Sequence, residues 1–368
     1  MLRRPLAAAL CAAALLLAAP LPARAEEAVL NVYNWSDYID PAALERFQKE
    51  TGIQVRYDVF DSVETLEGKL SAGRSGYDVI VPTSEPTFSR LVRAGALKPL
   101  DRTKIPNWGN QDPTLLRQVE SSDPGNQHGA IYLYGTVGLG IRADKVRELL
   151  PDTPLDSLDL LLKPENAKRL ASCGIAVMDS ATDVLPSVLH WLGRSPDSSD
   201  SADLQAAGEA LQAIRPHIRA IIASGNILDA LATGEYCVAM TYSGDVIQAK
   251  ARADEAKQGV QLRYVLPKKG AQLWFDMLAI PTDAPHPEAA HRFINFLLQP
   301  EVMGGITNAV HYPNAIPAAT PMVDAAVRED PNVYPTPEML ARTFTVRALS
   351  PQAERARSRL WNRFKAGH

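Results

Sequence analysis

The sequence predicts an α/β fold in two units, each a mixed, mostly parallel sheet flanked by helices. Short apolar strands alternate with amphipathic helices from Val29 to Gly95, and the alternation returns after Cys173. The apolar segment 130–146 is expected to be a long strand that enters the second unit, so long strands rather than a flexible linker join the two units. A cleft between the units is the expected consequence.

The individual elements follow from the same patterns. Strands are predicted at 29–33, 53–60, 77–82, 130–146, 173–179, 236–245, 260–267 and 273–281. Helices are predicted at 41–52, 63–71, before Gly95, at 184–192, from Val246, at 287–298, at 301–310 and at the C-terminus. The segment 101–128 is rich in Pro, Asn and Asp and is expected to consist mainly of loops.

The first 25 residues have the composition of a secretory signal. Arg3 and Arg4 precede an apolar run, and the small-residue sequence "ARA" ends just before Glu26. We expect cleavage after Ala25. No later apolar run approaches the roughly 20 residues that span a bilayer, so we expect a released protein.

Composition and charge limit the possible ligands. The chain has 368 residues, of which 46% are hydrophobic and 22% are charged, as in a globular protein of two domains. Removing the signal takes away three arginines, which leaves 35 basic and 42 acidic residues. This balance argues against nucleic acid or anionic membranes and favours cationic ligands.

The mature chain keeps two cysteines, Cys173 and Cys237. In an oxidising compartment an even pair indicates one disulfide, which would stabilise the fold by roughly 4 kcal/mol on the chain-entropy model. Two free buried thiols are the alternative.

Four predicted strand ends carry carboxylates, and three of them add aromatic rings. They are "NWSDY" with Trp35, Asp37 and Tyr38, "MDSATD" with Asp179 and Asp183, "TYSGD" with Tyr242 and Asp245, and "LWFD" with Trp274 and Asp276. Because ligands of open parallel sheets bind beyond the carboxyl ends of the strands, these side chains should line the cleft.

The chemistry of this set favours a ligand with cationic ends and an apolar middle. Helix N-termini at strand ends normally attract anions, and carboxylates placed there repel them. A carboxylate buried in a closing cleft needs a partner, while aromatic faces attract ammonium groups by about 2 kcal/mol or more when water is excluded. An aliphatic diamine meets both requirements.

Each of these residues also has a structural alternative. An Asp after a strand is most often a helix N-cap, which applies to Asp37, Asp179 and Asp245 taken singly. Trp35 and Trp274 can be core residues. Repetition at several strand ends favours binding, because independent caps have no reason to bring an aromatic ring each time.

Other motifs give less information about function. His286 and His291 are five residues apart, which differs from the i, i+4 pair of a zinc protease, so neither a metal site nor a cofactor is expected. The glycines of "GTVGLG" lack the spacing and lysine of a phosphate loop and are expected to allow close packing of the long strand.

Several motifs together resemble the periplasmic polyamine-binding proteins of ABC importers, above all the putrescine-binding type. They include "VYNWSDYI", "YDVIVP", "LKPENAKRLASCGIAVMD", "GEYCVAM" and "SGDVIQA", and the likeness covers essentially the whole mature chain. The resemblance implies a type II periplasmic binding protein fold that closes by a hinge motion, with no catalysis. It also implies a disulfide between Cys173 and Cys237, a monomer, and ABC permease subunits as partners.

The resemblance also implies a set of ligand-binding residues. They are Trp35, Ser36, Asp37, Tyr38, Ser84, Glu85, Asp183, Tyr242, Asp245, Trp274, Asp276 and Tyr312. We expect Asp245 and Asp276 to bind one ammonium group, and Asp37 and Asp183 to serve the other directly or through water. The aromatic residues would contact the methylene groups.

The segment after "VIVP" departs from the family pattern. "TSEPTF" is longer than the family's short serine-rich run, which leaves the register of Ser84 and Glu85 open. A Glu85 that faces the cleft would receive a third amine or a guanidinium, pointing to spermidine or agmatine. A Glu85 that faces water would be an acid in the first turn of a helix.

The expected units are interleaved in sequence. Residues 26–136 with 260–318 would form the first lobe, and residues 137–259 with 319–368 the second. Two other functions compete with transport: a secreted glycoside hydrolase built on paired carboxylates, and a sensor that uses the same binding fold to signal through a partner.

Overall fold

The computed structural model describes residues 29–71 and 73–367, so the predicted signal sequence, 1–25, lies outside the described residues. Nine strands of that part form one sheet, in the order β2-β1-β3-β9-β4-β7-β5-β6, with β8 paired to β4. The strands are β1 (Val29–Trp35), β2 (Gln54–Phe60), β3 (Val79–Ile80), β4 (Gly129–Arg142), β5 (Ile175–Met178), β6 (Ala220–Ile222), β7 (Val238–Tyr242), β8 (Leu262–Val265) and β9 (Leu273–Ala279).

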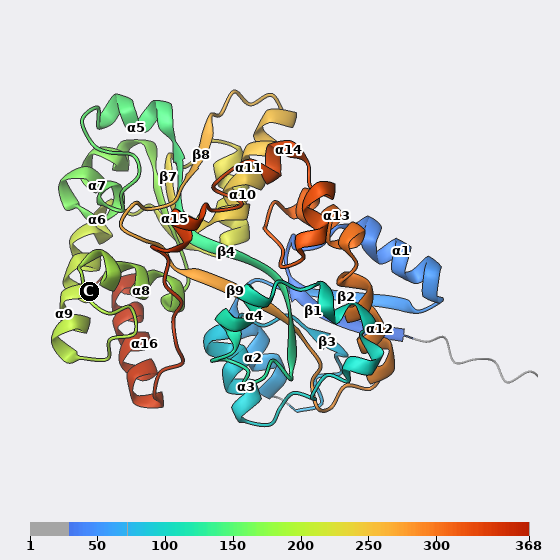
Figure 1. Cartoon of the computed structure of the whole chain (residues 1–368). Coiled ribbons are helices and arrows are strands. Elements are labelled where there is room, and N and C mark those ends of the chain that lie inside the picture. The colour runs from blue at the N-terminus through green and yellow to red at the C-terminus, as the bar shows by residue number, and fades with distance from the viewer. Residues whose placement is uncertain (1–28, 72, 368) are drawn as a thin grey trace, which may run out of the picture.

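Helices surround this sheet (Figure 1). They are α1 (Pro41–Thr51), α2 (Val63–Ser71), α3 (Ser89–Arg93), α4 (Pro113–Val119), α5 (Ala143–Leu149), α6 (Asp159–Leu162), α7 (Pro164–Leu170), α8 (Ala181–Trp191), α9 (Ser201–Ile214), α10 (Ser224–Ala232), α11 (Ser243–Glu255), α12 (Pro287–Leu297), α13 (Pro300–Val310), α14 (Ala325–Arg328), α15 (Pro337–Leu340) and α16 (Pro351–Ala366).

The sheet is mixed, as expected: its strands pair in parallel toward the two edges and antiparallel in the middle. β1 runs parallel to β2 and β3, and β5 runs parallel to β6 and β7. β4 and β9 are antiparallel to each other and to their other partners. We call β1, β2 and β3 with their helices the first half, and β5, β6 and β7 with theirs the second half.

β4 joins the halves. Its first residues, from Gly129 to Thr136, pair with β9, and its last, from Val137 to Arg142, pair with β7 and β8. The whole strand is buried apart from its last residue, which explains its continuous apolar sequence. A Cβ atom added at Gly135 would lie 2.5 Å from the Trp274 ring, so glycine lets β9 place that indole against β4.

The segments 260–318 and 319–368 can be placed relative to these halves. β8 pairs with the far end of β4 in the second half, and α16 packs on α8 and α9 there. β9 pairs with β3 in the first half. The lobe boundaries expected from the sequence stay a prediction.

The disulfide expected from the sequence is confirmed. Cys173 and Cys237 are bonded, with their Cα atoms 5.6 Å apart, directly before the neighbouring strands β5 and β7. The bond ties together two strands whose far ends reach the cleft.

Three expectations about elements are wrong. The strand expected over 130–146 ends at Arg142, and Ala143–Leu149 form α5. The segment 101–128, expected to be mainly loop, contains α4 and two 3-10 turns, each begun by proline or by an Asp cap. The helix expected from Val246 begins at Ser243, because the turn after β7 is itself helical. None of the described helices is long and apolar enough to cross a membrane.

Candidate ligand-binding cleft

A cleft with an empty volume of about 750 Å³, open mouth included, lies between the two halves. Its walls contain every residue that the family resemblance implied except Ser84, which is buried outside them. The described residues contain no cluster of three side chains suited to a metal ion.

Asp276 lies in the middle of β9 and not at a strand end, as the sequence had suggested. β9 passes beneath the cleft because it crosses between the halves, so its central residues reach the ligand space. The Asp276 side chain is 4% exposed, and its Oδ1 accepts a hydrogen bond of 2.7 Å from the Thr83 hydroxyl. Burial raises the pKa of Asp276 to about 7, a shift that Thr83 and Tyr38 oppose and the charge of Asp183 reinforces.

Asp245 lies in the first turn of α11. Its Oδ1 accepts a 2.7 Å bond from the Tyr312 hydroxyl, and its Oδ2 accepts one of 3.2 Å from Thr241. Burial raises the pKa of Asp245 to about 6 against these bonds. A Cβ atom at Gly244 would lie 2.3 Å from the Tyr312 ring, so glycine is needed for this approach.

Asp183 lies in the first turn of α8 and has the most donors of the three acids. Tyr242 and Ser180 donate to its Oδ2, and the Gln272 amide donates to its Oδ1 at 2.8 Å. Burial raises the pKa of Asp183, and these bonds moderate the shift. Gln272 was missed by sequence reasoning, since a single amide before a strand carries no pattern.

None of the described lysines or arginines forms an ion pair with Asp183, Asp245 or Asp276. Within the described residues, the hydrogen-bond donors to these three side chains are hydroxyl groups and one amide. Buried carboxylates of this kind are stabilised when a cation enters.

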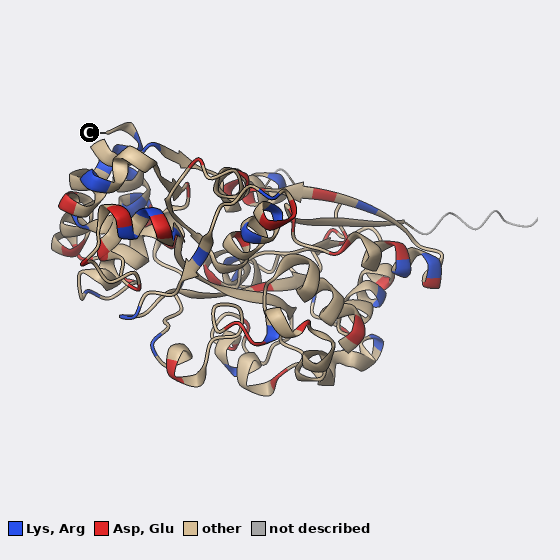
Figure 2. Ribbon diagram, turned by 90° about the horizontal axis from the view of Figure 1, so that it is seen from above, with Lys and Arg blue, Asp and Glu red and all other residues tan. Residues whose placement is uncertain are grey.

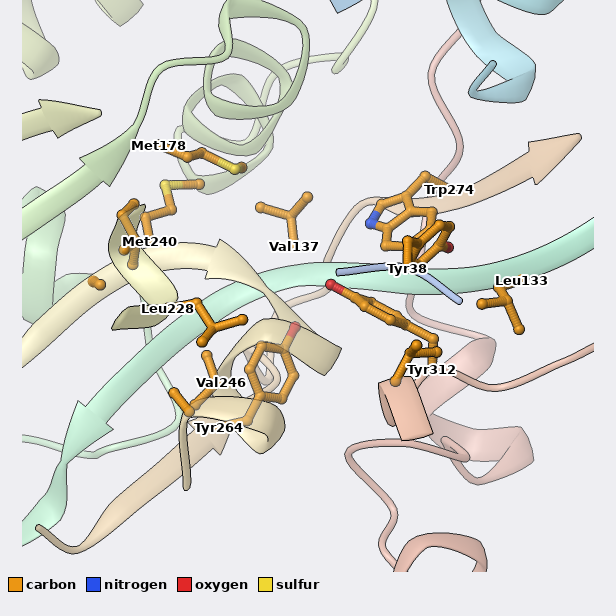
Figure 3. Close-up of a cluster of buried hydrophobic side chains, with 14 of the residues drawn as sticks. Tyr38, Leu133, Val137, Met178, Leu228, Met240, Val246, Tyr264, Trp274 and Tyr312 are labelled. Atoms are coloured by element: carbon orange, nitrogen blue, oxygen red, sulfur yellow. The ribbon is translucent and has the colours of Figure 1, made fainter. Parts of the chain in front are cut away.

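Aromatic rings form the apolar walls of the cleft. Figure 3 shows Tyr38, Trp274 and Tyr312 gathered beside β4. The Trp274 and Tyr312 ring centroids are 5.4 Å apart, and Tyr242 packs edge-on against Trp274 at 5.5 Å. Trp35 ends β1 and bonds through Nε1 to the Val81 carbonyl, so its indole is both anchored and part of the wall. Trp35 and Trp274 also pack in or against the hydrophobic core, so each is both a core residue and part of the cleft wall.

The helix-cap alternative fails for the three Asp residues to which it applied. The N-cap of α1 is Asp40, and those of α8 and α11 are Ser180 and Tyr242. Asp179 is not among the residues that line the cleft, and its oxygens accept bonds from Trp361 and Lys365 of α16.

Asp37 lines the cleft at its edge. Its backbone is left-handed, with φ of 53°, and its carboxylate bonds at 3.1 Å to Arg252 of α11. The side chain is 52% exposed. The neighbouring Ser36 hydroxyl bonds to the Phe60 carbonyl, so these two residues are tied to protein groups before any ligand enters.

Glu85 lines the cleft next to a cis peptide bond to Pro86. Its two carboxylate oxygens accept hydrogen bonds from Ser122 at 2.9 Å and Ser89 at 2.6 Å, both of which are buried in the first half. Glu85 is therefore part of the cleft wall and is held by hydroxyl groups, and its role toward a third amine stays a prediction.

Comparison with known proteins identifies the family. The model of the bacterial extracellular solute-binding proteins matches residues 42–336. The chain belongs to this family. Its members and the relatives described next are solute-binding proteins and not enzymes, which confirms the expectation of no catalysis.

The similar proteins are named for polyamine binding or transport. The chain is 48% identical over 93% of both chains to a putrescine-binding periplasmic protein of Pseudomonas aeruginosa, and 45% identical over 93% of both to one of Escherichia coli. The solved structure of a putative spermidine/putrescine ABC transporter protein from Listeria monocytogenes is 32% identical, with a TM-score of 0.81, over 92% of this chain and 99% of that one. The expected periplasmic binding protein fold is thereby confirmed.

Proposed function

We propose that this protein is a periplasmic receptor that captures putrescine and delivers it to the permease of an ABC importer. The observation that carries the proposal is a set of three buried cleft carboxylates among aromatic rings, and none of the three carboxylates forms an ion pair with a lysine or arginine of residues 29–71 and 73–367. The polyamine-binding relatives support it.

The two ammonium groups would bind at two ends of the cleft. Asp183 accepts a hydrogen bond from Gln272, which directly precedes the strand of Asp276. Asp37 accepts one from Arg252 of α11, the helix of Asp245. The charges of Asp183 and Asp37 also raise the pKa values of Asp276 and Asp245, which supports a grouping of the four acids into two pairs. This grouping differs from the sequence-based one, in which Asp245 shared an ammonium group with Asp276. We assign one ammonium group to Asp276 and Asp183, and the other to Asp245.

The methylene chain would lie between these ends against the aromatic rings. Tyr38, Trp274 and Tyr312 are each less than 8% exposed, so they are already packed and their positions need little ordering when the ligand binds. A diamine of matching length then gains apolar contact at both faces.

A second candidate ligand is spermidine or agmatine. Glu85 favours it, because this acid lines the cleft without an ion-pair partner among the described residues. Relatives named for spermidine/putrescine and putrescine/agmatine binding are also similar to this chain.

The test is a thermal-shift and calorimetric panel on protein that has been unfolded and refolded to remove bound ligand. The panel contains putrescine, cadaverine, agmatine, spermidine, oligosaccharides and, as the matched control, n-butylamine, which has putrescine's carbon chain and one ammonium group. Putrescine at about 1,000 times its Kd should stabilise the fold by about 4 kcal/mol.

The outcomes separate the candidates. We expect n-butylamine to bind at least 100-fold more weakly than putrescine, since one buried acid then stays unpaired. A stronger response to spermidine or agmatine would replace putrescine by the second candidate. Equal affinity for n-butylamine and putrescine, or no response to any amine, would contradict the proposal. Co-purification with permease subunits tests delivery.

A further inference from the structure

We propose that Arg252 and Arg90 are latches that hold the closed cleft shut and so slow the release of its ligand. The inference rests on the proposed receptor function, because a latch has a role only where two lobes open and close. Neither arginine lines the cleft, so both would act on retention of the ligand and not by touching it.

The first latch connects α11 to the end of β1. The Arg252 Nη1 donates to Asp229 of α10 at 2.7 Å, and its Nη2 donates to Asp37 at 3.1 Å. α10 and α11 pack on each other in the second half, while Asp37 follows β1 in the first half. Arg252 therefore has one acidic partner on its own side and one across the cleft.

The second latch repeats this arrangement in the opposite direction. Arg90 of α3 forms an ion pair with Glu67 of α2, in the first half. Its Nη1 also reaches Glu354 of α16 at 2.6 Å. α16 is fixed to the second half through the bonds of Trp361 and Lys365 to Asp179, which follows β5.

In both latches an acid on the arginine's own side holds the guanidinium in the orientation that meets the acid opposite. Such positioning reduces the side-chain entropy lost when the halves meet. In the view of Figure 1, α11 lies above the crossing of β4 and β9 and α16 below it, so the two latches fasten different edges.

The exposure of these pairs determines what they can do. The Arg252 side chain is 40% exposed and that of Arg90 33%, so each pair is weak and sensitive to salt. Weak pairs suffice here, because a two-state equilibrium between open and closed forms responds to small differences. Charged residues are common on helices throughout the molecule, as Figure 2 shows. What distinguishes Arg252 and Arg90 is that each forms an ion pair with an acid of the other half.

The experiment compares variants that break the pair across the cleft with matched variants that break the pair on the same side. Glu354→Gln removes the partner of Arg90 across the cleft, and Glu67→Gln removes the partner on its own side. Arg252→Gln and Asp229→Asn form the second set. Glu354→Gln is the cleaner probe, since Arg252 also lowers the pKa of Asp245 and its loss alters the cleft charge.

Small-angle X-ray scattering of ligand-free protein at about 10 mM and about 0.5 M ionic strength measures closure without any ligand. We expect the unaltered protein to be more compact at low salt. Glu354→Gln should be less compact and less sensitive to salt, because only the Arg252–Asp37 pair then connects the halves. Each variant across the cleft should lower the closed-to-open ratio by up to about five-fold, and the double variant by more.

Stopped-flow tryptophan fluorescence with putrescine gives the second measurement. The dissociation rate should rise by up to about five-fold in Glu354→Gln, while Glu67→Gln changes it less. Equal compactness of Glu354→Gln, Arg252→Gln and the unaltered protein at both salt concentrations would overturn the latches. Absence of putrescine binding in the unaltered protein would contradict the proposed function instead, because the scattering result does not depend on the ligand.

Discussion

Two regions of this molecule bury carboxylates in different ways. Asp78 and Asp123, both 0% exposed, lie outside the cleft lining. We call the buried part of the fold outside the cleft the frame. Asp78 accepts hydrogen bonds from the main-chain N–H groups of Asn31 and His286, and Asp123 accepts them from His128 and Gly129. In each case a histidine ring also meets the carboxylate.

The cleft carboxylates have a different set of donors. Asp276 accepts a bond from the Thr83 hydroxyl, and Asp245 accepts bonds from Tyr312 and Thr241. Main-chain N–H groups belong permanently to the fold, whereas these hydroxyls leave the carboxylates with raised pKa values. Asp78 and Asp123 therefore stabilise the fold itself through main-chain hydrogen bonds, whereas the cleft acids gain a charged partner only when a cation binds.

Replacing one acid from each region sharpens the comparison. Asp276→Asn should weaken putrescine binding by at least 100-fold, because loss of a buried charged partner typically costs about 3–5 kcal/mol. Asp78→Asn is the matched control and should lower the free energy of unfolding by about 1–3 kcal/mol while keeping the affinity. Calorimetry and denaturant unfolding measure both. An affinity unchanged in Asp276→Asn would remove this residue from the site.

The disulfide belongs to the frame and should affect stability alone. The double variant Cys173→Ala, Cys237→Ala should unfold at a free energy about 4 kcal/mol lower, given the separation of 64 residues. Its putrescine affinity below the unfolding transition should match that of the unaltered protein. Strongly reduced affinity at full folding would show that the bond also shapes the cleft.

Acidification should weaken binding through the cleft acids. A bound ammonium group favours the ionised carboxylate, so protonation of Asp276, with a pKa of about 7, and of Asp245, with one of about 6, opposes binding. Affinity should fall about 100-fold or more between pH 8 and pH 5. Calorimetry across this range checks it, and an affinity independent of pH would be the contrary result.

Without ligand the same groups act on stability with the opposite sign. Their folded pKa values are raised above the unfolded value near 3.9, so they stabilise the folded state most at low pH, and that contribution is lost as pH rises through about 6 to 7. The ligand-free protein should therefore melt at a higher temperature at pH 5.5 than at pH 8.

The smallest expected effect concerns the tyrosine that bonds to Asp183. Tyr242→Phe keeps the ring and removes the hydroxyl donor at 2.8 Å. Affinity should fall about five-fold, the value of one hydrogen bond near 1 kcal/mol. Tyr264→Phe, which removes a buried hydroxyl that bonds to Thr136, is the control and should leave affinity unchanged.

Local sequence patterns predicted those parts of the cleft that are contiguous in the chain. "NWSDY" placed Trp35, Asp37 and Tyr38 at the end of β1, where the structure has them along the cleft. The strand that contains Asp276 was predicted, but that the middle of this strand lines the cleft could not be, because it depends on how β9 pairs with β3 and β4. That pairing is long-range and leaves no local signal.

Contacts between residues that are distant in sequence could not be predicted either. Thr83 and Asp276 are 193 residues apart, and Arg90 and Glu354 are 264 apart. Single polar residues of this kind have no periodicity and no motif, and only the fold brings them together. The helices within 101–128 were missed for a related reason, since they are short and their proline and Asp residues also indicate turns.

The release of protons on binding tests most directly whether the cleft carboxylates await a cation. Calorimetric titration with putrescine at pH 6.5, in two buffers of different ionisation enthalpy, gives the number of protons exchanged. With pKa values of about 7 and about 6 for Asp276 and Asp245, about one proton should be released per putrescine bound. Binding of putrescine without proton release would contradict buried, partly protonated carboxylates as the ammonium sites.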